Sequence, residues 1–213
     1  MLSETTLKGI VGIIFDCDGV MIDSEEGNRY MYNKVLKRLG LPPMTREQEE
    51  YAFMATAMDA FRQMTPPEVH DSIEALYKDT VDYERDVLTR TKLMPGFLDF
   101  IFKAKEKGLK MAIDTNRMDS GIKRVLDYFR LPPYFDPVIT STNCVPKPAP
   151  LGAEKICAAW NILPGAALFV GDSENDKNTA DGAGVPFVAF GGKGLVGDIE
   201  VATFAELEKI LWN

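Results

Sequence analysis

Two aspartates, Asp16 and Asp18, lie one residue apart at the end of a short apolar run. Aspartate before glycine is common in turns, and Gly19 follows Asp18, so the pair alone is as typical of a turn as of a reactive site. Paired carboxylates can also bind a hard cation, or serve as a nucleophile and a proton carrier. The choice between these interpretations depends on the other side chains that the fold brings to the same place.

Three other strand-end regions also carry polar groups. These groups are Thr115 with Asn116, Lys147 in a proline-flanked loop, and Asp172 with Asp176. Because the carboxyl ends of parallel strands meet at one edge of a sheet, we expect them to lie together with the first pair. Clustered carboxylates repel one another unless a cation such as Mg²⁺ lies among them, whereas hydroxyl, amide and ammonium groups suit phosphate oxygens. As structural alternatives, Thr115 could cap the next helix and Lys147 could be a solvated loop charge.

The elements that must position these residues alternate along the chain. Strands are expected at Gly12–Phe15, Lys110–Asp114, Pro137–Thr140, Ala167–Val170 and Pro186–Phe190. Helices are expected at Phe97–Lys107, Met118–Phe129, Pro150–Trp160, Glu174–Ala183 and Thr203–Leu211. This alternation predicts an α/β fold, a Rossmann-like parallel sheet with helices on both faces.

Residues 24–92 interrupt this alternation with helical patterns and no convincing strand. Helices are expected from Ser24 to about Leu39 and at Thr45–Met58, Pro66–Asp79 and Tyr83–Thr91. We therefore predict two domains: a core formed by residues 1–23 and 93–213, and an α-helical cap formed by residues 24–92.

Composition limits the class of partner. The chain has 213 residues and a net charge of −8, which argues against a nucleic-acid or anionic-membrane surface. No apolar run reaches the length of a membrane span, and the first residues lack the pattern of a signal peptide. Three cysteines without paired spacing suit a reducing compartment. We expect a cytoplasmic protein that is a monomer or a weak homodimer.

Several chemistries can be excluded. The only histidine is His70, so zinc sites built on several histidines are ruled out. None of the three cysteines is followed at the sixth position by the arginine that a cysteine phosphatase needs. Gly192-x-Gly194-x-x-Gly197 has the spacing of a dinucleotide fingerprint, but it follows the last predicted strand, and too little chain remains for a further strand.

The ordered set of motifs resembles a known group. Asp16-x-Asp18-Gly19-Val20, Thr115, Lys147 and Gly171-Asp172-Ser173-x-x-Asp176 occur in the order found in the haloacid dehalogenase-like hydrolase superfamily. The helical segment after the first strand makes the chain similar to the branch of phosphoglycolate phosphatase and β-phosphoglucomutase. The resemblance implies a Mg²⁺-dependent phosphatase that acts on a small phosphorylated metabolite.

The resemblance also implies roles for residues. Asp16 would attack phosphorus and form an aspartyl-phosphate, and Asp18 would protonate the leaving oxygen and then take a proton from water. Thr115 and the Asn116 amide would bind phosphoryl oxygens, and Lys147 would neutralise charge on the nucleophile and the phosphate.

For the metal, the resemblance implies the Asp16 carboxylate, the Asp18 backbone carbonyl and Asp172 as ligands of Mg²⁺. Asp176 would lie behind them and orient metal-bound water or Lys147. The alternative is that Asp176 is itself a direct ligand.

The cap is expected to choose the substrate. Arg62 falls near the family's cap specificity loop and could meet a second anionic group, although an arginine on the helix surface is at least as consistent with the pattern. Arg117 follows Thr115-Asn116, where a small residue is more usual, and could add positive charge near the phosphate. Three alternatives to a phosphatase stay open: a phosphomutase of the β-phosphoglucomutase type, a non-enzymatic receiver-like protein that accepts a phosphoryl group on aspartate, and an inactive binding module.

Overall fold

The computed structural model describes residues 8–192 and 194–212. Residues 1–7, on which the signal-peptide expectation partly rests, lie outside the described residues. Within the described ranges, every helix is too short or too polar to cross a membrane.

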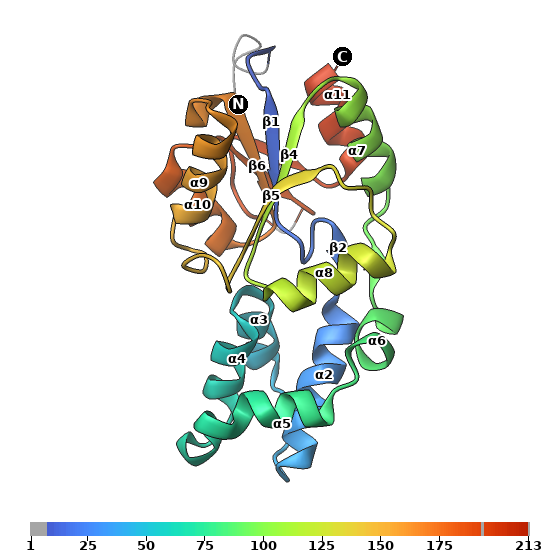
Figure 1. Ribbon diagram of the computed structural model, residues 1–213, viewed down its shortest axis with the longest axis vertical. Coiled ribbons are helices and arrows are strands. Elements are labelled where there is room, and N and C mark those ends of the chain that lie inside the picture. The colour runs from blue at the N-terminus through green and yellow to red at the C-terminus, as the bar shows by residue number, and fades with distance from the viewer. Residues whose placement is uncertain (1–7, 193, 213) are drawn as a thin grey trace.

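A parallel six-stranded sheet forms the centre of the larger part of the molecule (Figure 1). Its strands, in spatial order, are β5 (Phe135–Thr140), β4 (Lys110–Thr115), β1 (Gly12–Phe15), β6 (Ala167–Gly171), β7 (Phe187–Phe190) and β8 (Ile199–Val201). Strand β1 lies between β4 and β6, and all of its residues are buried. An uninterrupted apolar strand is typical of a sheet that is covered on both faces, so the predicted α/β fold is confirmed.

The observed strands differ from the predicted ones mainly at the edges of the sheet. Strand β5 begins two residues earlier than expected, at Phe135. Strand β8 was not predicted, because it has only three residues and places the exposed Glu200 between two buried ones. Such a short edge strand carries too little periodicity to stand out in the sequence.

Helices cover both faces of this sheet. They are α7 (Phe97–Glu106), α9 (Leu151–Trp160), α10 (Glu174–Ala183) and α11 (Phe204–Trp212). Helix α8 (Asp119–Tyr128) lies between the sheet and the inserted helices (Figure 1). Helices α9 and α10 lie on one side and α7 and α11 on the other (Figure 1). On the second side, the rings of Phe15 and Phe97 meet edge to face at 5.8 Å. The sheet is thus held between two apolar layers, which leaves the carboxyl ends of its strands open towards α8 and the inserted helices.

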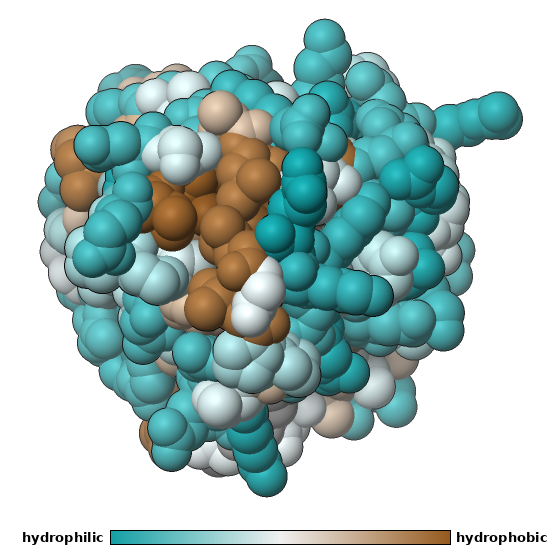
Figure 2. All heavy atoms as spheres, turned by 90° about the horizontal axis from the view of Figure 1, so that it is seen from below, coloured by the Kyte–Doolittle hydropathy of each residue, from teal (hydrophilic) through white to brown (hydrophobic). Residues whose placement is uncertain are grey.

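The insertion between β1 and β4 is helical, as predicted. Its elements are α2 (Glu25–Arg38), α3 (Arg46–Met54), α4 (Ala57–Met64), a 3₁₀ helix (Pro67–Ser72), α5 (Ile73–Thr80), α6 (Tyr83–Asp86) and a 3₁₀ turn (Leu88–Arg90). Two short antiparallel strands, β2 (Ile22–Asp23) and β3 (Lys92–Leu93), flank it and were not predicted. Seen from below, the helical end of the molecule carries an apolar area surrounded by hydrophilic residues (Figure 2). The division of the chain into a core domain and a cap domain stays a prediction.

The expectation of one helix over Thr45–Met58 is wrong. Helix α3 ends at Met54, Ala55 is extended (φ −82°, ψ 171°), and the Thr56 hydroxyl caps α4 by accepting a hydrogen bond from the Asp59 amide. Because threonine side chains compete with helical backbone hydrogen bonds, the chain turns at this point. The turn exposes the last carbonyl groups of α3, which become important at the site.

Candidate active site

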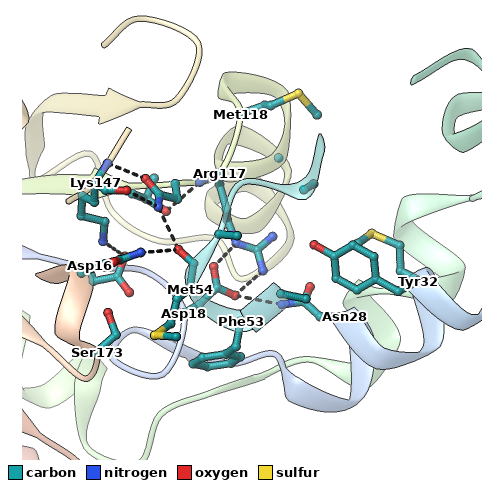
Figure 3. A pocket seen from close by; sticks show the side chains of 18 of the residues that line it. Asp16, Asp18, Asn28, Tyr32, Phe53, Met54, Arg117, Met118, Lys147 and Ser173 are labelled. Carbon is teal, nitrogen blue, oxygen red and sulfur yellow. Dashed lines mark hydrogen bonds and ion pairs between the residues drawn. The ribbon is translucent and has the colours of Figure 1, made fainter. Parts of the chain in front are cut away.

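The strand ends meet in one small cavity between the core and the inserted helices (Figure 3). Its volume is about 80 Å³. From the core it is lined by Asp16, Asp18, Thr115, Asn116, Arg117, Lys147 and Asp172, and from the insertion by residues that include Asn28, Tyr32, Met54 and Tyr83. The structure therefore brings together the candidate residues from four separate strand ends.

Lys147 lies between two buried carboxylates. Its Nζ is 2.6 Å from Oδ1 of Asp16 and 2.5 Å from Oδ1 of Asp176. Burial alone would lower the pKa of Lys147, but the two carboxylates outweigh it and raise that pKa, so the ammonium stays charged. The alternative of a solvated loop charge does not hold, because Lys147 is only 7% exposed.

Asp16 lies in surroundings that disfavour its negative charge. Burial raises the pKa of Asp16 well above its usual range, Lys147 opposes this rise, and the charges of Asp176, Asp18 and Asp172 add to it. A nucleophilic carboxylate must be ionised. The cluster therefore needs positive charge beyond Lys147.

The donor set fits a hard cation. Carboxylate oxygens of Asp16, Asp172 and Asp176 lie within 4.8 Å of one another, and all three residues are buried. Gly19 lies against this group with φ +78°, and a Cβ there would be 2.1 Å from Oδ2 of Asp172. Buried oxygen ligands at such spacing suit Mg²⁺. The buried triad can therefore hold a metal ion.

Asp176 differs from the other two carboxylates because the protein already occupies both of its oxygens. Oδ1 accepts from Lys147, and Oδ2 accepts from the Ser173 hydroxyl (2.6 Å) and from the Ser173 and Asp172 amides (3.1 and 3.3 Å). These bonds fix the turn that carries Asp172. They favour a supporting role for Asp176 over direct ligation.

The carboxylate of Asp18 lies against Arg117 (Figure 3). It accepts two hydrogen bonds from Arg117, 2.7 Å from Nε and 2.6 Å from Nη2, and others from Ser24 and Asn28. Burial would raise the pKa of Asp18, but Arg117 and Ser24 outweigh it and lower that pKa. The Asp18 carboxylate is thus held by Arg117, Ser24 and Asn28, and the role of its backbone carbonyl as a metal ligand stays a prediction.

The side chains of Thr115 and Asn116 have different hydrogen-bond partners. The Thr115 side chain is buried, and its Oγ1 accepts from the Arg117 amide at 3.1 Å. The Asn116 side chain instead joins two loops: its Nδ2 donates to the carbonyl oxygens of Met54 and Lys147, and its Oδ1 accepts from the Lys147 amide. A phosphate contact by Asn116 would therefore have to come from its backbone amide.

Arg62 is not brought to the cavity. It lies on the exposed side of α4 and pairs with Asp59 at 3.0 Å, with half of its side chain in solvent. The turn between α3 and α4 presents Met54 and Ala55 to the cavity instead. The sequence interpretation also missed Asn28 and Tyr83, whose positions depend on how the insertion packs and leave no local signal.

The side-chain amides of two core asparagines hydrogen-bond to the insertion. The Met54 carbonyl accepts from Nδ2 of Asn116 at 2.9 Å and from Nδ2 of Asn175 at 3.1 Å. Since α3 ends at Met54, its carbonyl has no helical partner and can accept both bonds. These two bonds link the insertion to two core loops.

Asn175→Ala is expected to loosen this closure. One of two hydrogen bonds, each contributing about 1 kcal/mol, is lost, so amides at the α3–α4 turn should exchange hydrogen roughly fivefold faster. Exchange followed by mass spectrometry measures this. Glu174→Ala, an exposed neighbour, is the control, and unchanged exchange in Asn175→Ala would contradict the role given to this contact.

Asp114 is a buried carboxyl group whose Oδ2 has no hydrogen-bond partner among the described residues. It lies against Gly152 of α9, where a Cβ would come within 2.4 Å of Oδ2. Burial raises its pKa from 3.8 to about 6, although Lys147 opposes the rise. The folded state therefore binds more protons than the unfolded state between these pH values, and the free energy of unfolding falls as pH rises through them.

Asp114→Asn is expected to remove this loss of stability. At pH 8 the variant should be more stable than the unaltered protein by at most roughly 3 kcal/mol, and at pH 4 the gain should nearly vanish. Urea denaturation at both pH values measures this, with the exposed Asp79→Asn as control. An equal gain at both pH values would show that the proton of Asp114 is not the cause.

The chain is similar in sequence to known proteins. A family model described as haloacid dehalogenase-like hydrolase matches residues 13–190. A phosphoglycolate phosphatase of Rhodobacter capsulatus is 33% identical over 185 residues, which cover 84% of this chain and 83% of that protein.

Solved structures agree in fold. The crystal structure of a HAD-superfamily hydrolase of subfamily IA from Geobacter sulfurreducens is 30% identical, covers 95% of this chain and 97% of that one, and has a TM-score of 0.75. That of a predicted phosphoglycolate phosphatase from Haemophilus somnus is 21% identical, covers 95% and 98%, and has a TM-score of 0.84.

Proposed function

The chain belongs to the haloacid dehalogenase-like hydrolase family, and from this premise we propose that it is a Mg²⁺-dependent phosphatase of small phosphomonoesters. The observation that carries the proposal is the buried group of Asp16, Asp172 and Asp176 around Lys147. Relatives named phosphoglycolate phosphatase make phosphoglycolate the first substrate to test.

In the first step, an Asp16 oxygen attacks phosphorus and the bond from phosphorus to the ester oxygen breaks. Asp18 gives its proton to the departing oxygen, which leaves as an alcohol. The hydroxyl of Thr115 and the ammonium of Lys147 bind oxygens of the transferred group. When bound by Asp16, Asp172 and the Asp18 carbonyl, Mg²⁺ supplies the positive charge that lets two anions approach each other.

In the second step, Asp18 takes a proton from water, the water oxygen attacks phosphorus, and the bond to Asp16 breaks to release phosphate. The ion pair with Arg117 favours the ionised Asp18 that this step needs. The first step needs the protonated form, so we expect the ion pair to loosen when a substrate is bound.

The test is steady release of inorganic phosphate from a panel of metabolite phosphates that includes phosphoglycolate and glucose 1-phosphate. We expect many turnovers with Mg²⁺, none with EDTA, and recovery when Mg²⁺ is added in excess. A single stoichiometric phosphorylation would indicate a receiver-like protein, and conversion of glucose 1-phosphate into an isomer would indicate a phosphomutase. No turnover with any substrate would refute the proposal.

A further inference from the structure

We propose that Arg117 and Tyr83 form a binding site for a carboxylate group of the substrate, next to the phosphate site. The proposal rests on the proposed phosphatase function and deepens it, because it restricts the substrates to short phosphomonoesters of hydroxy acids. It also assigns specificity to a core residue and to a residue of the insertion other than Arg62.

Arg117 has donors to spare inside the cavity. Three of its five N–H groups have acceptors. The Nε group and one Nη2 group donate to Asp18, and one Nη1 group donates to the Tyr83 hydroxyl. Across the described parts of the chain, its two other N–H groups have no acceptor. The side chain is only 10% exposed, so these groups are not freely hydrated. An anion in the cavity would satisfy them.

Tyr83 offers a further donor. Its hydroxyl oxygen accepts from Arg117, and its own hydrogen has no acceptor among residues 8–192 and 194–212. Burial raises the pKa of Tyr83, so the phenol keeps that hydrogen. Because Tyr83 comes from α6 and Arg117 from the core, the two donors come together only when the insertion lies against the core, as it does in this structure.

The first turn of α8 adds to the positive potential. Ser120 and Gly121 lie in this turn and line the same cavity, so the partial positive charge of the helix N-terminus faces it. Gly121 lies beside Tyr83, where a Cβ would make an ordinary contact with the hydroxyl oxygen at 3.7 Å.

The position of Arg117 limits the distance between the phosphoryl group and the carboxylate of the substrate. The leaving oxygen must come within about 3 Å of the Asp18 carboxylate, which is itself 2.6 Å from Arg117. A group on Arg117 therefore lies close to the leaving oxygen. The cavity of about 80 Å³ has room for a short chain between them.

Charge favours a carboxylate over a second phosphate. Arg117 already has one anionic partner in Asp18, so one further negative charge is tolerated better than two. Lys147 is occupied by Asp16 and Asp176. The third cation of the lining, Arg124, is half exposed, 3.6 Å from Glu84 and 5.3 Å from the ring of Tyr83. Arg62, which pairs with Asp59 outside the cavity, is therefore the control.

The first experiment compares kcat/KM for phosphoglycolate and for ethyl phosphate, which lacks the carboxylate. Arg117→Met is expected to lose roughly 30-fold or more on phosphoglycolate beyond its loss on ethyl phosphate. Arg117→Lys should recover part of this, and Tyr83→Phe should lose an intermediate factor on phosphoglycolate alone. Arg62→Met should leave the ratio of the two values unchanged.

The second experiment measures binding without turnover. In the presence of Mg²⁺, 3-phosphonopropionate carries the carboxylate and propylphosphonate does not, and calorimetry gives the Kd of each. The unaltered protein should bind 3-phosphonopropionate more tightly, and Arg117→Met should abolish the difference.

The outcomes separate this proposal from the proposed function. If the unaltered protein hydrolyses phosphoglycolate but Arg117→Met weakens both substrates equally, Arg117 acts only through Asp18 and the carboxylate site is refuted. If no substrate is hydrolysed, the phosphatase proposal fails, and the phosphonate affinities still decide whether the carboxylate site exists. Equal affinity of the unaltered protein for both phosphonates would overturn it.

Discussion

Asp16→Asn is expected to abolish phosphate release, by roughly 10⁴-fold or more, while the protein stays folded. The amide cannot form the bond to phosphorus but keeps the shape of the side chain. Folding should tolerate the change, because burial already disfavours the charge of Asp16 and Lys147 keeps Asp176 as its partner. Phosphate release and the thermal unfolding midpoint are measured together.

The control is the exposed Asp71→Asn, which should keep full activity. An Asp16→Asn protein that releases phosphate at an appreciable rate would refute the covalent mechanism. An unfolded one would leave the question to Asp16→Glu, which keeps the charge but moves the oxygen and should also be inactive.

Lys147→Met is expected to remove both activity and a large part of the stability. It leaves the carboxylates of Asp16 and Asp176 buried without their ammonium partner, and breaking such a buried pair destabilises by about 3–5 kcal/mol. Urea denaturation measures the loss. Added Mg²⁺ should restore part of it, because a cation at Asp16 and Asp172 would offset the same repulsion.

Lys177→Met is the matched control, since Lys177 pairs with Asp181 on the surface of α10. Exposed pairs of this kind contribute at most about 1 kcal/mol. If Lys147→Met were as stable as Lys177→Met, the account of Lys147 as the charge balance of the site would be wrong.

The positions of the main site residues could be predicted from the sequence, because each of them ends or directly follows an apolar strand. Asp16 follows β1, Thr115 ends β4 and Asp172 follows β6. Neighbouring parallel strands bring such residues together at one edge of the sheet. The long helical insertion was equally visible, since nearly seventy residues show helical periodicity and no strand pattern.

The hydrogen-bond partners of the site side chains could not be predicted from the sequence. Nothing in the order of residues shows that the Asp18 carboxylate accepts hydrogen bonds from Arg117, 99 positions away, or that the Tyr83 hydroxyl accepts another from the same arginine. The same holds for the Asn116 side chain, which binds two carbonyls, and for the break at Ala55. Except for the break at Ala55, these features depend on how segments distant in the sequence pack together, which periodicity does not encode.

The central claim is that Asp16 carries the phosphoryl group during turnover. In Asp18→Asn, the water that attacks the intermediate loses its base, so the phosphorylated form should accumulate. Because Asp18→Asn also lacks the acid of the first step, it is mixed with Mg²⁺ and acetyl phosphate, whose acetate group leaves without a proton. The protein is then quenched, reduced with borohydride and mapped by mass spectrometry. The account predicts homoserine at position 16, where the acyl phosphate was reduced, and at no other aspartate. Phosphate release by the unaltered protein together with an unmodified Asp16 in Asp18→Asn would contradict it.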